Sequence, residues 1–378
     1  MKKIILLSKH NIFLFSLLLS LNSFSQDFNI QHVQEDVGRN GASNSSFAPV
    51  SSLNSAFLLS NNNRKVSAGR IGNSGNLQGD DMAGAAVLTA LDEITYFRES
   101  ASVNANTRFS SSIWEYIGEN GGNNEMIVRG RYAINLNGGT NSNNLNLATA
   151  TGTLSAVNNA NNCIPFITGI MNSTGSQDAD SGTALAYLEN DGSSMRVFKG
   201  SNANNVTVYI TLIEFTGSNW AVLHGDSGNT GSDTGSITLK TNADGTGTTA
   251  NVNDWSESII FSHHIGDTGS SGANDAIADN WPLMRSGGNN QSVDWVFNSN
   301  HDSAGTNRHF THVLLNNNLN VTRYQSNSDA ANENTIDISS ANLTNINQAL
   351  IIGSSNSSGG GSAYGRGWRN YYFNSVNQ

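Results

Sequence analysis

The sequence predicts an all-β protein built from tandem antiparallel β-sandwich repeats. Its apolar residues are grouped in short alternating runs, and turns rich in Asn, Gly and Ser separate these runs. Sequence patterns also recur at a spacing of roughly 100 residues, the size of one small sandwich. The same strands are compatible with an alternative, one continuous closed β array built from three and a half repeats.

The clearest recurring element is a β-hairpin. Its best copy is Asn205 to Asp226, and an earlier strand, Asn106 to Tyr116, aligns on the first strand of that copy without a gap. Each first strand is followed by a Gly/Asn turn and a second short strand that ends in Gly, the pattern of a hairpin. A third, degenerate copy lies at Arg308 to Tyr324.

Alternation in the best copy predicts which side chains share a face. Val206, Val208, Ile210 and Leu212 fall on one side of the strand and Ile213 and Phe215 on the other, so both faces carry apolar groups. We therefore expect this strand to lie in the middle of a sheet that is packed on one side and partly covered on the other.

Two further patterns mark the repeat boundaries. A linker that ends in an apolar strand starts at Val50, Val157, Val252 and Leu343, and an aromatic strand that ends in Ser recurs at Thr95 to Ser100, Arg196 to Ser201, Asp294 to Ser299 and Asn370 to Ser375. The predicted organisation is a leader at 1–25, an N-terminal arm at 26–49, repeats at 50–156, 157–251 and 252–342, and a truncated fourth repeat at 343–378.

The first 25 residues have the features of a secretory signal peptide. Lys2, Lys3 and Lys9 precede an apolar run at Ile12 to Leu21 that is too short to span a bilayer, and small residues lead to a cleavage position near Ser25-Gln26. We expect a secreted product, located outside the cell or at its surface, without a transmembrane segment.

Charge and cysteine usage narrow the range of partners. Loss of the leader removes three of the 19 Lys and Arg residues and none of the 29 Asp and Glu residues, which takes the net charge from −10 to −13. Such an acidic chain is not expected to bind nucleic acid.

Cys163 is the one cysteine, so the chain cannot form an internal disulfide, and a buried, apolar role in the strand Cys163 to Met171 is expected. The run Met82 to Leu91 is compatible with a short helix or a strand.

Two glutamates and a group of histidines are candidate functional residues. Glu115 and Glu214 occupy matching places in successive hairpins, which favours a structural role, pairing with an arginine or capping a turn, over catalysis. Five of the seven histidines after the leader lie in the third repeat. There His263 replaces Thr168, His309 and His312 replace Tyr209 and Leu212, and Leu314 stands where the glutamate would be.

These histidines are compatible with a local binding site or with ordinary surface or interface roles. His309 and His312 are three residues apart on a strand and should face opposite ways, which argues against a simple metal chelate. No metal ligand set and no cofactor are predicted. Acidic loops at Asp80-Asp81, Asp178 to Asp180 and Asp226 to Asp233 leave bound Ca²⁺ open as an alternative to solvated turns.

Tryptophans supply the remaining candidate binding residues. Trp281 and Trp368 lie in Gly/Asn-rich surroundings, and Trp295 lies in an aromatic strand. Such side chains can stack on sugar rings or serve as core anchors. No catalytic residues are predicted, because no nucleophile elbow, HExxH motif, Walker loop or spaced carboxylate pair stands out.

The repeats resemble the repeated β domains of bacterial surface and phage appendage proteins. The resemblance is carried by the apolar linker strand, the following strand with its Glu-Phe end, and the short strand that ends in Gly. The resemblance covers Val50 to Ser375 and implies a structural or adhesive role, with no catalytic residue to transfer. Partners would then be other copies of the chain or surface glycans. The alternatives are an extracellular carbohydrate-binding protein and, less favoured, a polysaccharide-active enzyme. A deep cleft that holds a carboxylate pair, or His263 with His309, would favour the enzyme.

The N-terminal arm has a strand of its own. Phe28, Ile30 and His32 alternate with polar residues, and the truncated fourth repeat lacks the hairpin that follows the aromatic strand elsewhere. An open sheet edge is a template for another strand. We therefore expect the arm, Gln26 to Val37, to complete the fourth repeat, either within one chain or between chains to build a filament.

Overall fold

The computed structural model describes most of the chain after the leader. The described residues are 27–38, 41–64, 84–98, 107–172, 183–200, 205–266, 282–297, 307–324, 337–341, 343 and 345–352. Several predicted features lie outside these residues: the leader, Trp281, Trp368, the loops at Asp80-Asp81 and Asp178 to Asp180, and the aromatic strand of the fourth repeat.

The described part of the chain is all-β, as predicted. Its strands are β1 (Phe28–Val37), β2 (Ala42–Ser46), β3 (Ala56–Arg64), β4 (Gly84–Ala90), β5 (Glu93–Phe97), β6 (Thr107–Tyr116), β7 (Met126–Leu136), β8 (Ser142–Asn146), β9 (Cys163–Asn172), β10 (Ala184–Leu188), β11 (Ser194–Lys199), β12 (Val206–Phe215), β13 (Ala221–Thr230), β14 (Thr234–Thr238), β15 (Ser258–Ile265), β16 (Leu283–Ser286), β17 (Ser292–Val296) and β18 (Asn307–Leu315). The short 3-10 helices are η1 (Ala160–Asn162), η3 (Trp255–Glu257), η5 (Ser339–Ala341) and η6 (Ile346–Gln348). The run that was ambiguous between helix and strand forms β4.

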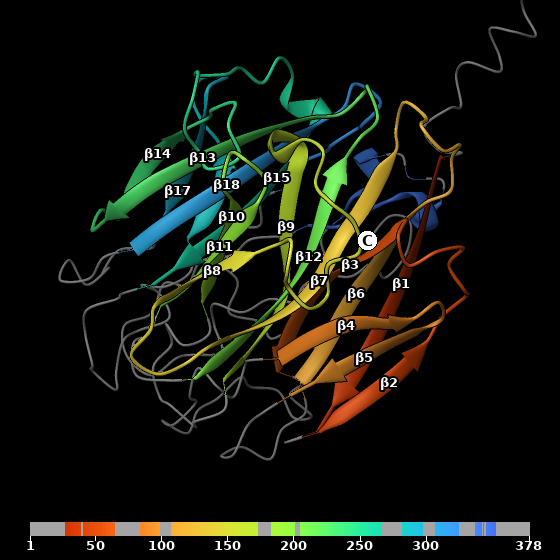
Figure 1. Ribbon diagram of the computed structural model, residues 1–378. Helices are drawn as coiled ribbons and strands as arrows, with labels where there is room; N and C mark the ends of the chain where they lie inside the picture. The colour runs from red at the N-terminus through yellow and green to blue at the C-terminus, as the bar shows by residue number, and fades with distance from the viewer. Residues whose placement is uncertain are drawn as a thin grey trace, which may run out of the picture.

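The strands form four antiparallel sheets arranged around an axis (Figure 1). Two are three-stranded, β1-β6-β3 and β14-β17-β16. The other two are six-stranded, β2-β5-β4-β9-β12-β7 and β13-β18-β15-β10-β11-β8. Each six-stranded sheet crosses a predicted repeat boundary, so the repeats are not separate sandwiches joined by linkers.

Strand pairing shows how one repeat completes the next. We call β1-β6-β3, β7-β12-β9 and β13-β18-β15 the inner ladders of the first, second and third sandwiches, and β2-β5-β4, β8-β11-β10 and β14-β17-β16 their outer ladders. The middle strands of the inner ladders, β6, β12 and β18, pair with β1, β7 and β13 respectively. The outer strands β5, β11 and β17 likewise pair with β2, β8 and β14. The strands that end one sequence repeat therefore belong to the sandwich of the following repeat, and the N-terminal arm supplies β1 and β2 to the first sandwich. The predicted hairpin is wrong: β6 and β7, like β12 and β13, are consecutive strands that lie in different sheets and do not pair, because the turn between them carries the chain from one sandwich to the next.

Each sandwich has its own apolar core between an inner and an outer ladder. In the second sandwich this core contains Val208 and Leu212, both fully buried, on the β12 face that alternation predicted. The opposite face of β12 contributes Ile213 and Phe215 to a separate cluster, which we call the central aromatic cluster. Its buried members are Phe28, Ile30, Phe57, Trp114, Tyr116, Met126, Val128, Ile164, Phe166, Ile213, Phe215, Trp220, Val222, Phe261 and Leu314.

The central aromatic cluster ties the three inner ladders together. Phe166 of β9 stacks on Phe57 of β3 with ring centroids 4.9 Å apart and meets Phe261 of β15 edge-on at 4.8 Å. Offset and edge-on aromatic pairs add to the stabilisation that comes from area burial. Residues from all three sandwiches thus share one core.

A glycine sets the contact between the first and second sandwiches. Strand β4 joins β9 at Gly84 opposite Ile170 and at Ala85 opposite Gly169. A Cβ atom on Gly169 would lie 2.2 Å from the Cα of Ala85, closer than nonbonded atoms approach. Glycine at 169 therefore permits the backbones to approach where two repeats share a sheet.

Ladder register corrects one detail of the repeat alignment. Ala56 pairs with Glu115, Cys163 with Glu214 and Ser258 with Leu315. The third repeat therefore has Leu315, not Leu314, at the place of the glutamate. Cys163 begins β9 and is buried as predicted, and burial followed by the charge of Glu214 raises the pKa of its thiol.

Candidate functional site

The linkers that precede β3, β9 and β15 are each held by a side chain from the segment that follows β6, β12 or β18 respectively. At the first linker Arg131 of β7 donates from Nη2 to the carbonyl oxygens of Leu53 at 2.6 Å and Ala56 at 2.8 Å. Burial lowers the pKa of the Arg131 guanidinium to about 10, so it stays charged at neutral pH. The contact is charge-assisted, which makes it stronger than a neutral hydrogen bond.

The third linker has the same arrangement. Arg323 donates to the carbonyl of Trp255 at 2.5 Å and to that of Ser258 at 2.9 Å. Because Ala56 and Ser258 occupy the same ladder position, these carbonyls match those held by Arg131. The segment that follows β18 is therefore placed like β7, although it forms no regular strand within residues 316 to 324.

Histidines hold the second and fourth linkers. His224 of β13 places Nε2 3.0 Å from the carbonyl oxygen of Asn161, and His32 of β1 places Nε2 3.0 Å from that of Ile346. The Nδ1 atom of His32 also lies 2.9 Å from the hydroxyl of Ser112 on β6. Ile346 belongs to η6, which packs against β1. The arm thus holds the linker of the fourth repeat as β7 and β13 hold those of the first and second.

The arm is also seated in the first sandwich. Phe28 and Ile30 are each 6% exposed and enter the central aromatic cluster, where the ring of Phe28 meets Trp114 and Trp220 edge-on. Of the fourth repeat, residues 345–352 form η6 and no strand, so the predicted apolar strand at the end of this linker is not observed there, and the aromatic strand lies outside the described residues. Completion of that repeat stays a prediction, whereas contact between the arm and its linker is observed.

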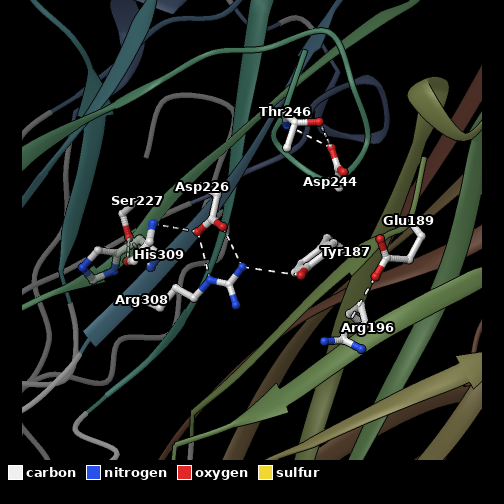
Figure 2. Close-up of polar contacts among 10 residues, drawn as sticks. Tyr187, Glu189, Arg196, Asp226, Ser227, Asp244, Thr246, Arg308 and His309 are labelled. Atoms are coloured by element: carbon white, nitrogen blue, oxygen red, sulfur yellow. Dashed lines mark hydrogen bonds and ion pairs between the residues drawn. The ribbon is translucent and has the colours of Figure 1, made fainter.

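An ion pair fastens the arm to the first sandwich, and its counterpart recurs in the third. Asp36 of β1 pairs with Arg108 of β6 at 2.9 Å, and Asp226 of β13 pairs with Arg308 of β18 at 2.6 Å. Figure 2 shows Arg308 between Asp226 and the hydroxyl of Tyr187. Burial lowers the pKa of Arg308, but the hydrogen bond and charge of Asp226 outweigh it and raise that pKa above its usual value. Asp226, which was a possible Ca²⁺ ligand, is thus an ion-pair partner.

The two glutamates at matching repeat positions, Glu115 and Glu214, make structural contacts, as the sequence predicted. Glu214 is 2% exposed and accepts from Arg129 Nε at 2.7 Å and from the backbone N–H groups of Asn158 at 3.0 Å and Asn159 at 2.8 Å. Glu115, 3% exposed, accepts from the hydroxyl of Ser51 at 2.6 Å. Each carboxylate therefore holds the linker that enters its own repeat.

Three histidines meet at the boundary between the second and third sandwiches. The Nδ1 atoms of His224 and His312 lie 2.9 Å apart, and the ring centroid of His263 lies 5.4 Å from that of His312. His263 Nδ1 lies 3.2 Å from the carbonyl oxygen of Ala186 on β10. We call His224, His263 and His312 the histidine cluster. The sequence singled out two of its members but did not connect them.

His309 and His312 face opposite sides of β18, as predicted. Both are fully buried, so neither is a surface residue. The ring of His309 packs on Trp295 at 5.2 Å and on Phe297 at 5.4 Å, away from the histidine cluster. His309 and His263 therefore do not share a cleft. Trp295 is 6% exposed and belongs to a core cluster, so its ring faces are not available to a sugar.

Sequence reasoning missed His224 because the residue was treated only as part of the hairpin pattern. A signal was present: His224 directly precedes the glycine that ends the repeated strand, where the first repeat has Arg129, another polar residue in an apolar strand. Only the ladder, which sets His224 opposite His312, shows that the two imidazoles meet.

Within the described residues, no group of three or more His, Cys, Asp or Glu side chains is arranged to hold a metal ion. No helix in that part of the chain is long and apolar enough to cross a membrane. Comparisons with protein-family models, with curated proteins and with solved structures found no match. The function of the chain is therefore inferred from its own geometry alone.

Proposed function

We propose that the chain is an exported structural or adhesive protein of the cell surface. One observation carries the proposal: every sandwich is completed by strands from the preceding segment, and the six-stranded sheets cross the repeat boundaries. Neighbouring sandwiches cannot separate without loss of the ladder β4–β9 or β10–β15 and exposure of the central aromatic cluster. Such continuity suits a protein that bears mechanical load or holds a binding surface away from the cell.

The arm gives this architecture a means of assembly. It reaches the first sandwich through Phe28, Ile30 and Asp36 and the fourth linker through His32. An arm from a second copy presents the same side chains, so it can occupy the same ladder beside β6. Strand exchange of this kind gives closed monomers when the arm binds within its own chain, and head-to-tail filaments when it binds the next chain.

Two point variants on the arm test the proposal. Ile30→Asp places a carboxylate in the central aromatic cluster, whereas Gln34→Asp makes the same change at an exposed position of the same strand. Assembly is measured by light scattering and negative-stain imaging over a range of concentrations, together with the melting temperature. We expect Ile30→Asp to abolish polymers, or to lower the melting temperature by several degrees if the arm acts within one chain, and Gln34→Asp to do neither.

Deletion of Gln26 to Val37 is the second test. If the deleted protein matches the parent in both assembly state and melting temperature, the arm has no role in closure or polymerisation and the assembly proposal fails. Glycan binding by the parent that is lost in Trp281→Ala or Trp368→Ala would instead favour the carbohydrate-binding alternative.

A further inference from the structure

The histidine cluster lies where the second and third sandwiches have few main-chain contacts. Strands β10 and β15 join the two halves of one six-stranded sheet, and the ladder between them consists of the single pair Ala184 and His264. Other polar contacts at this seam include those from His263 to the carbonyl of Ala186, from the N–H of Gly266 to the hydroxyl of Thr183 at 3.1 Å, and from Arg308 to the hydroxyl of Tyr187 at 3.5 Å. Such a thin seam depends strongly on the side chains that pack beside it.

Hydrogen bonds determine which ring nitrogen of each neutral imidazole, His224 and His312, carries the hydrogen. The carbonyl of Asn161 requires a proton on Nε2 of His224, so Nδ1 of His224 is an acceptor. Nδ1 of His312 must then carry the proton that it donates to His224, and Nε2 of His312 is left as an unprotonated acceptor. This atom is buried and makes no hydrogen bond of good geometry, although the carbonyl of Ala186 favours the charged form of His312 and partly offsets the effect of burial on its pKa. The neutral arrangement is therefore complete apart from one lone pair.

A proton on His224 or His312 disrupts this arrangement. If the pair takes up two protons, both Nδ1 atoms carry a hydrogen and face each other at 2.9 Å, whereas a single proton can reside on Nε2 of His312 with the hydrogen bond between the rings kept. If His312 gains a proton at Nε2, a cation is created in a fully buried side chain. A buried charge without a partner destabilises the folded state by several kcal/mol.

The charged groups around the cluster do little to neutralise such a proton. Asp244 favours the charged form of His224, but its effect is smaller than that of burial. Asp226, two residues along β13, is ion-paired with Arg308. From the neighbouring loop, Lys240 directs its ammonium group to the hydroxyl of Thr249.

The remaining neighbours carry no charge that would offset a buried imidazolium. On β15, His264 adjoins His263, and on β18, His309 faces the opposite side towards Trp295. On β9, Cys163 keeps its thiol proton because burial raises its pKa.

We propose that the histidine cluster is an acid-sensitive switch that opens the seam between the second and third sandwiches. Above the ordinary titration range of histidine the cluster is neutral and the seam is closed. As the pH falls, charge is placed on buried imidazoles that all lie on the ladder β13-β18-β15. Separation of β15 from β10 and of β13 from the second linker exposes these imidazoles to water and so relieves the cost of the buried charge. The first sandwich keeps its contacts, because the equivalent of His312 there is Ser112.

The direction of the pH effect follows from burial. Burial lowers the pKa of His224 and of His263 from 6.5 to about 4, and lowers that of His312 well below 6.5, with His224 and His263 adding to the effect on His312. A group whose pKa is depressed by folding stabilises the folded state fully above its unfolded value, and this stabilisation is lost as the pH falls from 6.5 through about 4. For His224 alone, the unfolding constant should rise about 30-fold by pH 5.

The experiment compares urea unfolding of the parent with that of two variants at pH 7.5 and pH 5, a window in which most carboxylates remain ionised. His312→Ser copies Ser112, whose hydroxyl meets His32 as His312 meets His224. His264→Gln is the matched control, because it removes an adjacent imidazole outside the cluster. We expect the unfolding constant of the parent and of the control to rise at least 30-fold between these pH values. The rise in His312→Ser should be smaller by about tenfold or more.

Hydrogen exchange of the parent locates the opening and does not require that the variant fold. At pH 5 the amides of β15 and β13 should lose protection before those of β1 and β6. Equal pH dependence in parent and His312→Ser, or simultaneous loss of protection in all ladders, would overturn the proposal. Loss of parent stability on addition of a chelator at pH 7.5 would also overturn it, because the cluster would then hold a metal ion.

Discussion

Removal of the Glu214 carboxylate should destabilise the second sandwich by about 3 to 5 kcal/mol, the usual cost of breaking a buried ion pair from one side. Arg129 and Glu214 have side chains that are 6% and 2% exposed and lie 2.7 Å apart. In Glu214→Ala the guanidinium keeps its hydrogen bond to Ser155 at 2.9 Å and loses its counter-charge. The N–H groups of Asn158 and Asn159 also lose their acceptor, but both residues are exposed, so water can replace it at little cost.

A double variant separates the pair's net contribution from the cost of leaving one charge unpaired. The third repeat has Leu315 at the place of Glu214, which shows that the ladder accepts an apolar residue there. In Glu214→Leu with Arg129→Met, no unpaired charge remains, and we expect a free energy of unfolding within about 1 kcal/mol of the parent.

The assay is urea unfolding at pH 7.5, followed by tryptophan fluorescence and by circular dichroism, with the free energy taken from the linear dependence on urea. Glu189→Ala is the control, because its partner Arg196 lies 3.6 Å away and both side chains are 36% exposed. That pair should contribute less than about 1 kcal/mol. A loss below about 1 kcal/mol in Glu214→Ala, or a double variant less stable than the single variant, would refute the reasoning.

Three further predictions follow from the packing. Leu212→Asp should unfold the second sandwich, because a fully buried side chain is replaced by an unpaired carboxylate at a cost of several kcal/mol; a cooperative urea transition close to the parental midpoint would contradict this. Gly169→Val should weaken the contact between the first and second sandwiches, since its Cβ would overlap Ala85, and hydrogen exchange should show early loss of protection in β4. If the order in which β4 and β12 lose protection is the same in Gly169→Val as in the parent, Gly169 does not set this contact. Far-ultraviolet circular dichroism of the protein without its leader should be β-dominated, and a helix content above about one third would disagree with the fold.

Local sequence patterns predicted the all-β class and the two faces of β12, but not every strand, since residues 316–324 and 345–352 form no strand where one was expected. Alternation placed Val208 and Leu212 on one face of β12 and Ile213 and Phe215 on the other, and both faces are buried in the structure. Side chains on a strand point alternately to its two faces, so the pattern of apolar residues records the two surfaces directly. The matched glutamates were also informative, because a carboxylate that recurs at the same strand position must satisfy the same backbone each time.

Register was harder to predict from one chain. In the third repeat the alignment of His312 with Leu212 was off by one position, and the ladder sets His312 opposite His224, where the first sandwich sets Ser112 opposite His32. A shift of one residue changes the face of every side chain on a strand. For this reason the histidine cluster could not be found by spacing, although two of its three members were already candidates.

The sequence by itself determined that this chain is a repeated β protein and that the strand Val206–Phe215 is apolar on both faces. These properties depend on neighbouring residues and their period, so they can be read along the chain. Only the tertiary structure decided that β7 and β13 complete the following sandwich, that the arm is seated beside β6 and holds Ile346, and that His224, His263 and His312 meet. Residues 32 and 346 are brought together by the closure of sheets around an axis, and contacts at that separation leave no periodic signal in a single sequence.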